Sequence, residues 1–381
     1  MAFLTDLKWI NGKWIDFATN DTIYGTAGSD QVVLGAGKDF FNDIDGGHDQ
    51  VTDVARDSLG SGNDVVSTGI GNDGVTTDLD SANAYYGGLG RDTLNVSPAQ
   101  SGVFVNLAQG FAQNLGTGVQ SVVNSFENVS GSINADTIYG DSWSNNIYGG
   151  AGNDLIDGGT SGDVVMGMEG NDRVFGGADY DIVVGGLGDD QVYGDAGGDT
   201  VYGNEGNDRV SGGTGHDTLY GGDGNDLMFG EADMDYMLGE AGNDIMHGGT
   251  GEDTLLGGLG NDALEGMAGR DFLSGNAGND RFVFRSLADS PLATPDRITD
   301  FQHIVDKMDV SLIDARANVA GNQAFSYIGD HGFTNSGQIK SHYFAAQNTT
   351  VVSLNTDTDS AAEMTINLTG HITLAASDFI L

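Results

Sequence analysis

Aspartate recurs at every ninth residue through the central part of the chain, and this spacing carries the clearest chemical signal. The series runs without insertion or deletion, and glycine begins every nonapeptide from Gly149 to Gly275. Its members are Asp154, Asp163, Asp172, Asp181, Asp190, Asp199, Asp208, Asp217, Asp226, Asp235, Asp244, Asp253, Asp262, Asp271 and Asp280. Carboxylate and carbonyl oxygens are the ligands that Ca²⁺ prefers, at six or more per ion. Because one short loop cannot supply that many, two loops are expected to share each ion.

The repeat also defines the elements that must position these carboxylates. Each nonapeptide is expected to form a six-residue glycine-rich loop and a three-residue strand. The eighth position is apolar in every copy, from Ile156 to Phe282, so this side chain alone is expected to point inward. Glycine at the first and fourth positions permits positive φ, and the fourth position departs from glycine at Ser161, Asp179 and Asp233. A fixed period with fixed chemistry at each position predicts a solenoid.

Two nonapeptides are expected to complete one coil, so that loops on the same edge lie eighteen residues apart. Ions are then expected between the loops of Asp154 and Asp172, and of Asp163 and Asp181. The apolar eighth residues would line two facing parallel sheets. One sheet would align Ile156, Val174, Val192, Val210, Met228, Met246, Leu264 and Phe282. The other would align Val165, Val183, Val201, Leu219, Met237, Leu255 and Leu273.

The repeats resemble the repeats-in-toxin (RTX, hemolysin-type calcium-binding) family, whose motif Gly-Gly-x-Gly-x-Asp-x-apolar-x is carried by residues 149–283. The resemblance implies an all-β fold, a parallel β-roll solenoid with several bound calcium ions. Asp136 holds the aspartate position in an earlier copy that lacks the loop glycines, and we include it among the metal ligands. The alternative is a plain β-helix with surface aspartates. That alternative gives no reason for aspartate at one loop position in consecutive repeats.

The rest of the chain divides by how well it keeps the repeat. Residues 1–19 are expected to be a short lead, residues 20–130 a degenerate region of the same repeat, residues 131–284 the main calcium-binding roll, and residues 285–381 a β-rich cap. Insertions break the frame in the degenerate region. Calcium binding there and a metal-free β-module are both open, and the best candidates are Asp30, Asp64, Asp73 and Asp92.

Residues 296–381 resemble the C-terminal domain of serralysin-type secreted metalloproteases. The resemblance implies a cap on the roll and an uncleaved type I secretion signal, which would end in an acidic residue followed by three apolar ones, as Asp378-Phe-Ile-Leu381 does. Residues 355–363 lack the glycines of the loop that the family often has. Their loss argues against a metal site at Asp357 and Asp359.

Composition limits the partners. Lys and Arg number 14 against 56 Asp and Glu, for a formal net charge of −42. Such a surface repels nucleic acid and anionic membranes and attracts divalent cations. There is no cysteine, no apolar run of membrane-spanning length and no basic, apolar start of the kind that a Sec signal peptide has. Extracellular calcium modules bind at about 10⁻⁴–10⁻³ M, so we expect a secreted protein. The resemblance to serralysin-type proteins implies a bacterial protein with a transient type I exporter as partner. A cell-surface or polysaccharide partner is expected outside the cell.

No familiar catalytic motif is present. His-Glu-x-x-His, Gly-x-Ser-x-Gly and a phosphate-binding Gly-Lys-Ser/Thr loop are all absent from the sequence. Two hypotheses follow: a non-enzymatic matrix, adhesion or surface protein, and an exported hydrolase-like enzyme with an unrecognised site in residues 1–130. One outer face of the roll, which includes Tyr202 and Tyr220, is apolar. This face is explained by a neighbouring segment that covers it, by strand triplets such as Thr-Leu-Tyr220 that are simply good β formers, or by self-association or ligand binding.

Overall fold

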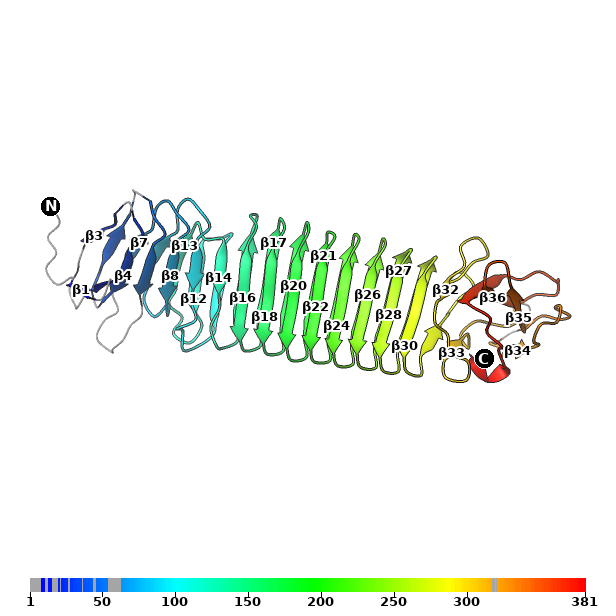
Figure 1. Cartoon of the computed structure of the whole chain (residues 1–381). Coiled ribbons are helices and arrows are strands. Elements are labelled where there is room, and N and C mark those ends of the chain that lie inside the picture. Colours follow the sequence, from blue (N-terminus) through cyan, green and yellow to red (C-terminus); the bar gives the residue numbers. More distant parts are fainter. Residues whose placement is uncertain are drawn as a thin grey trace. The chain divides into compact units, whose positions relative to one another are not determined.

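The computed structural model describes residues 8–10, 13–15, 20, 22–26, 28–35, 37–43, 46–53, 63–316, 319 and 321–381. These residues form strands, turns and one 3₁₀ turn, η1 (Ala376–Asp378), which confirms the all-β prediction (Figure 1). The chain separates into two compact units, Met1–Gly188 and Asp189–Leu381. Each unit is a parallel β-solenoid. No helix in the described part of the chain is long and apolar enough to cross a membrane.

The strands of the regular repeat are longer than the sequence predicts. In unit 1, β17 (Leu155–Thr160) and β19 (Arg173–Ala178) pair in parallel over their full length, from Leu155 opposite Arg173 to Thr160 opposite Ala178. The prediction of three-residue strands is therefore wrong. The backbone groups at the first three loop positions continue the sheet ladder, and only three residues of each repeat are left to turn the chain.

The turn explains why glycine dominates the fourth position. Gly224 and Gly242 have φ of +144° and +148°, and a Cβ on Gly242 would lie 1.4 Å from the carbonyl oxygen of Gly224. The exceptions Ser161, Asp179 and Asp233 have φ of +78°, +77° and +74°. They adopt the left-handed helical region, which short polar side chains tolerate better than others.

Unit 1 contains two sheets whose strands follow one another in nearly strict alternation along the chain. One sheet consists of β1 (Lys8–Ile10), β2 (Lys13–Ile15), β4 (Gln31–Leu34), β6 (Gln50–Asp53), β8 (Gly74–Thr77), β10 (Thr93–Asn95), β14 (Asn128–Ser130), β16 (Asn146–Ala151), β18 (Val164–Glu169) and β20 (Ile182–Leu187). The other consists of β3 (Thr22–Tyr24), β5 (Phe40–Asn42), β7 (Val65–Ser67), β9 (Ala84–Tyr86), β11 (Val103–Asn106), β12 (Phe111–Asn114), β13 (Gln120–Asn124), β15 (Thr137–Asp141), β17 and β19.

An antiparallel excursion interrupts the solenoid of unit 1. Strand β13 pairs in parallel with β9, β12 pairs antiparallel with both β13 and β11, and β11 returns to a parallel pairing with β15. The three strands fill one coil position of the second sheet and carry the ladder from the degenerate coils to the regular ones.

Unit 2 continues the same pattern and ends in a cap. One sheet consists of β22 (Thr200–Glu205), β24 (Thr218–Asp223), β26 (Tyr236–Ala241), β28 (Thr254–Leu259), β30 (Phe272–Ala277), β32 (Arg297–Ile298), β37 (Met364–Thr369), β36 (Thr349–Asn355), β35 (Gln338–Phe344) and β34 (Ser326–Tyr327). The other consists of β21 (Gln191–Ala196), β23 (Arg209–Thr214), β25 (Leu227–Ala232), β27 (Ile245–Gly251), β29 (Ala263–Gly269), β31 (Arg281–Val283), β33 (Lys307–Asp309) and β38 (Phe379–Ile380).

The predicted core is confirmed in both units. Every eighth-position side chain predicted to point inward, from Ile156 to Phe282, has no exposed surface. Eighteen-residue register is confirmed by pairs such as Val201 opposite Leu219. The predicted segment boundaries at residues 19, 130 and 284 follow changes of repeat pattern and stay predictions.

The apolar outer face of unit 2 is open over part of its length. The rings of Tyr202 and Tyr220 stack with centroids 4.8 Å apart and planes 6° from parallel. Tyr236 and Phe272 on the same sheet are 40% and 37% exposed. Within the described residues, therefore, no neighbouring segment covers this face completely.

Candidate metal centre

Within each unit, the loop aspartates form a ladder along each edge of the regular coils. Each carboxylate is buried, with at most 4% of its residue surface exposed. One oxygen, Oδ1, accepts the backbone N–H of the residue eighteen positions earlier at 2.7–3.0 Å. The acceptors in these bonds are Asp154, Asp163, Asp172, Asp181, Asp208, Asp217, Asp226, Asp235, Asp244, Asp253, Asp262, Asp271 and Asp280. Asp190 and Asp199 take part as donors to Asp208 and Asp217.

The second oxygen of most ladder carboxylates has no protein partner. Among the described residues, Oδ2 is buried without a hydrogen bond in Asp154, Asp163, Asp208, Asp217, Asp226, Asp235, Asp244, Asp253, Asp262, Asp271 and Asp280. A buried ionised carboxylate oxygen without a partner is costly, because desolvation of the charge is not compensated. A row of such oxygens fits a bound cation, which would compensate their charge.

Backbone carbonyls border the same space. A Cβ on Gly221, the first residue of its repeat, would lie 2.4 Å from Asp226 Oδ2 and 2.7 Å from the carbonyl oxygen of Gly239. Gly149, Asp154 and the carbonyl of Gly167 show the same arrangement at 2.4 and 2.7 Å. The first-position glycine thus leaves a small volume lined by one carboxylate oxygen and one carbonyl oxygen.

These donors fit calcium. They are oxygens only, they come from two loops one coil apart, and they combine negative charge with backbone dipoles, as Ca²⁺ sites do. Bound calcium would supply the charge that the unpartnered oxygens lack. The role of the chain's own residues is to hold the carboxylates in register by the N–H to Oδ1 bonds and to keep the first loop position free of a side chain.

The ladder extends beyond the predicted set. Asp296 Oδ1 accepts the N–H of Asp271 at 2.9 Å, and Asp306 Oδ1 accepts the N–H of Asp280 at 3.1 Å. Asp296 is fully buried and its Oδ2 has no hydrogen-bond partner in the described structure. The eighteen-residue spacing does not predict these residues, because Asp296 follows Asp271 by 25 positions and Asp306 follows Asp280 by 26. The signal was the tripeptide Asp-Arg-Ile298, which matches Asp-Arg-Phe282.

Asp136 differs from the other predicted ligands. Its Oδ1 accepts the N–H of Val103 at 2.7 Å and its Oδ2 accepts the N–H of Ser132 at 2.6 Å. The hydroxyl of Ser132 adds a third bond at 2.9 Å. Protein donors therefore satisfy both oxygens of this carboxylate, and at this coil they replace part of what an ion would supply.

The degenerate region carries the same ladder at irregular steps. Asp49 accepts the N–H of Asp30, Asp73 accepts that of Asp49, and Asp92 accepts that of Asp73, at 2.8–2.9 Å. Asp64 accepts the N–H of Asp39 on the other edge at 2.6 Å. The candidates Asp30, Asp64, Asp73 and Asp92 therefore occupy ladder positions, and Asp49 joins them.

Two further polar groups belong to the loops and the cap. Exposed asparagine amides of unit 2 form a ladder with Nδ2 to Oδ1 distances of 2.9–3.0 Å, through Asn207, Asn225, Asn243, Asn261 and Asn279. In the cap, oxygens of Asp357, Asp359 and Glu363 lie within 4.8 Å of one another. Each of these three accepts a nearby backbone N–H, so the local turn already uses them.

Burial raises the pKa of the ladder carboxyls, and the charges of neighbouring rungs raise it further. The pKa of Asp154 rises to about 7, that of Asp235 to about 8 and that of Asp296 to about 9, against an ordinary value of 3.8. In the metal-free fold, ionising these groups is therefore unfavourable near neutral pH.

The metal-free chain is expected to regain structure as pH falls. A folded-state pKa raised above the unfolded value means that the fold binds more protons, so its stability is largest at low pH and is lost as pH rises through about 6–8. Far-UV circular dichroism of calcium-free chain should show more β-structure at about pH 5 than at about pH 8. The calcium-saturated chain is the control and should change little. Equal spectra of the metal-free chain at both values would contradict the assignment.

Comparison with known proteins agrees with this geometry. The family described as peptidase M10 serralysin C terminal matches residues 16–381. Serralysin C of Dickeya chrysanthemi is 32% identical over 100 residues, which are 26% of this chain and 19% of that protein. The aligned region is thus about a fifth of the length of that relative.

Solved structures with some similarity include two repeat subunits of a mannuronan C5-epimerase from Azotobacter vinelandii. The AlgE6R3 subunit is 24% identical, with 42% of this chain and 78% of the subunit covered and a TM-score of 0.22. The AlgE6R2 subunit is 23% identical, with 44% and 91% covered and a TM-score of 0.23.

Proposed function

We propose that this chain, which belongs to the peptidase M10 serralysin C-terminal family, is a secreted calcium-binding RTX protein that folds when calcium binds outside the cell. The observation that carries the proposal is the row of buried Oδ2 atoms without a protein partner. Ions that bind only the folded coils add their binding free energy to folding. At the calcium concentration of a cytoplasm, the chain would stay largely unfolded and fit for transport.

The role outside the cell is proposed to be structural, as a matrix, adhesion or surface component. The enzyme alternative needs an accessible site in residues 1–130. One polar cluster among the described residues there joins Asp53 Oδ2 to the Tyr85 hydroxyl and to Asn83 Nδ2, each at 2.7 Å. Tyr85 has no exposed surface and Asp53 is 8% exposed, so substrate does not reach this cluster. Its hydrogen bonds instead stabilise the interior of the degenerate coils.

A polysaccharide partner is supported by one surface of unit 1. Trp143, 70% exposed, borders a hollow of about 610 Å³ together with Tyr139, Asp141 and Asp157. An exposed indole offers a flat apolar surface, and the carboxylates accept hydrogen bonds from hydroxyl groups. Screens of the calcium-loaded chain for polysaccharide binding and for hydrolase activity separate the two roles: binding without turnover supports a surface component, and turnover supports the enzyme.

Export is expected to depend on a type I exporter. In a bacterial host that carries such an exporter, the full chain should accumulate in the medium, because low cytoplasmic calcium keeps the coils unfolded. In the same host without the exporter it should stay in the cells. Immunoblots of cells and medium measure the partition. Equal amounts in the medium of both hosts, with a cytoplasmic marker retained in the cells, would remove the exporter from the proposal.

A further inference from the structure

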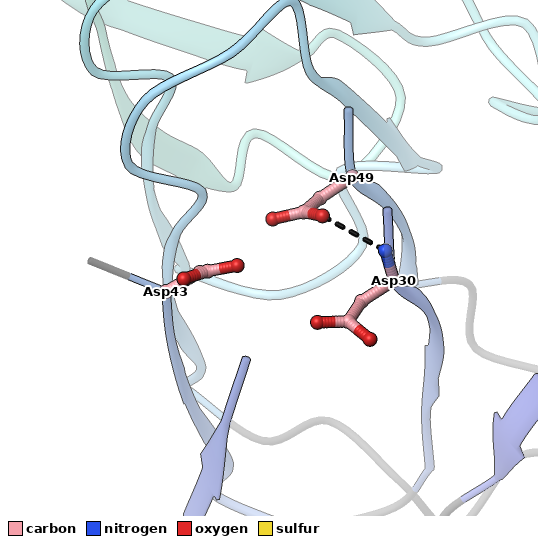
Figure 2. Close-up of side chains that lie close together, drawn as sticks. All are labelled: Asp30, Asp43 and Asp49. Atoms are coloured by element: carbon pink, nitrogen blue, oxygen red, sulfur yellow. Dashed lines mark hydrogen bonds between the residues drawn. The ribbon is translucent and has the colours of Figure 1, made fainter. Parts of the chain in front are cut away.

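We propose that Asp30, Asp43 and Asp49 form a calcium site of a different kind, with a third carboxylate that the regular repeat cannot accommodate. The three residues come from the first described coils of unit 1. Asp30 precedes β4, Asp43 follows β5 and Asp49 precedes β6. Their carboxylates converge, with one oxygen from each within 4.8 Å of the others (Figure 2).

An unpartnered buried oxygen faces this cluster. Asp49 has no exposed surface; its Oδ1 accepts the N–H of Asp30 at 2.9 Å, while its Oδ2 has no hydrogen bond within the described residues. Asp30 Oδ2 accepts the N–H and the hydroxyl of Thr26, at 2.6 and 3.1 Å. Neither donor is charged. Three carboxylates at this separation repel one another at low dielectric, and a divalent cation among them would remove that repulsion.

The regular repeat excludes such a third carboxylate. Each regular loop begins with glycine, and a Cβ on Gly149 would lie 2.4 Å from Asp154 Oδ2. The loop from Asp43 to Asp49 begins with aspartate instead and is one residue longer than the loop from Gly149 to Asp154. The carboxylate of Asp43 occupies the space beside Gly25, where a Cβ would lie 2.4 Å from Asp43 Oδ2. Asp43 therefore adds a carboxylate at a position that the regular repeat leaves to glycine.

The donor set defines the ligand class. Oxygen donors with three negative charges suit Ca²⁺, and affinity for calcium rises with the number of charged ligands. Mg²⁺ demands near-octahedral geometry and keeps several waters, which a buried carboxylate cluster does not favour. This site is therefore expected to hold calcium at concentrations that leave the regular coils unfilled.

Calorimetric titration of the full, calcium-free chain with CaCl₂ tests the site, with native mass spectrometry to count ions at low calcium. The unchanged chain should show a first tight phase of one ion. Asp43→Gly, which restores the glycine of the repeat, and Asp43→Asn should weaken that phase at least about tenfold, because one charged ligand is lost. The matched control Glu205→Gln removes one exposed charge and should leave the tight phase intact.

The result that overturns the proposal is a tight phase of equal affinity in Asp43→Gly and in Glu205→Gln, or no tight phase in the unchanged chain. Circular dichroism at saturating calcium shows whether each variant folds. If Asp43→Asn does not fold, Asp43→Gly decides, because glycine suits this loop position elsewhere in the chain. If the regular coils do not bind calcium, the titration still shows the single tight ion. If the site of Asp30, Asp43 and Asp49 is absent, the tight phase is missing. The two failures are therefore distinguishable.

Discussion

In excess chelator the full chain is expected to lose most of its β-structure, and calcium at about 1 mM should restore it. The ladder carboxylates explain the size of the effect. The carboxylates of Asp226 and Asp244 each accept the N–H one coil away through Oδ1 and have an Oδ2 without a hydrogen bond. Without the ion, ionising such carboxylates leaves buried charges uncompensated next to one another, and one apolar side chain per repeat does not offset that cost.

Far-UV circular dichroism during a calcium titration measures this transition. Magnesium at the same concentration is the control, since its compact octahedral preference does not match two flexible carbonyl-lined loops. A cooperative rise in β signal with calcium and a smaller response to magnesium are expected. Full β-structure in excess chelator at neutral pH would show that the coils do not need the metal, and the functional proposal would then fail.

Gly242→Ala is expected to destabilise the calcium-loaded roll by about 2–4 kcal/mol. Its backbone has φ of +148°, and the added Cβ would lie 1.4 Å from the carbonyl oxygen of Gly224. Backbone rather than a flexible side chain blocks the space, so the turn must shift. The shift displaces the carbonyls that border the carboxylate of Asp244, so the calcium concentration needed for folding should rise as well.

Asp233→Ala is the matched control, because Asp233 holds the same position of a neighbouring repeat with φ of +74°. Here the backbone already accommodates a Cβ, and the expected loss is about 1 kcal/mol or less. Guanidinium unfolding at saturating calcium measures both variants. If the two lose equal stability, the clash at Gly242 is relieved without cost and the structural reason given for the fourth-position glycine is wrong.

Much of the regular roll follows from the sequence, because one nonapeptide specifies the core residue, the edge carboxylate and the register of the strands. The apolar eighth residue places Leu219 inside, the sixth residue places Asp226 at the edge, and the period sets the eighteen-residue register that the strand pairs confirm. The choice of oxygen ligands, and hence of calcium, also follows from residue type alone. Strand length did not follow, because the ladder continues through backbone groups at the first three loop positions, whichever residues occupy them.

The irregular ends depended on the tertiary structure. Asp49, Asp73 and Asp92 follow their ladder partners by 19, 24 and 19 residues, and Asp296 follows Asp271 by 25. Insertions of different length lengthen the turns and leave the sheet register intact. A fixed spacing along the chain therefore does not predict these ladder partners, although their hydrogen bonds are preserved. For the same reason no spacing rule joins Asp43 to Asp30 and Asp49. Residue type and period predict the candidate oxygen ligands and the repeat of a regular coil. The stacking of unequal loops decides where the ladder continues and where a third carboxylate enters, because that depends on which loops the sheets bring side by side.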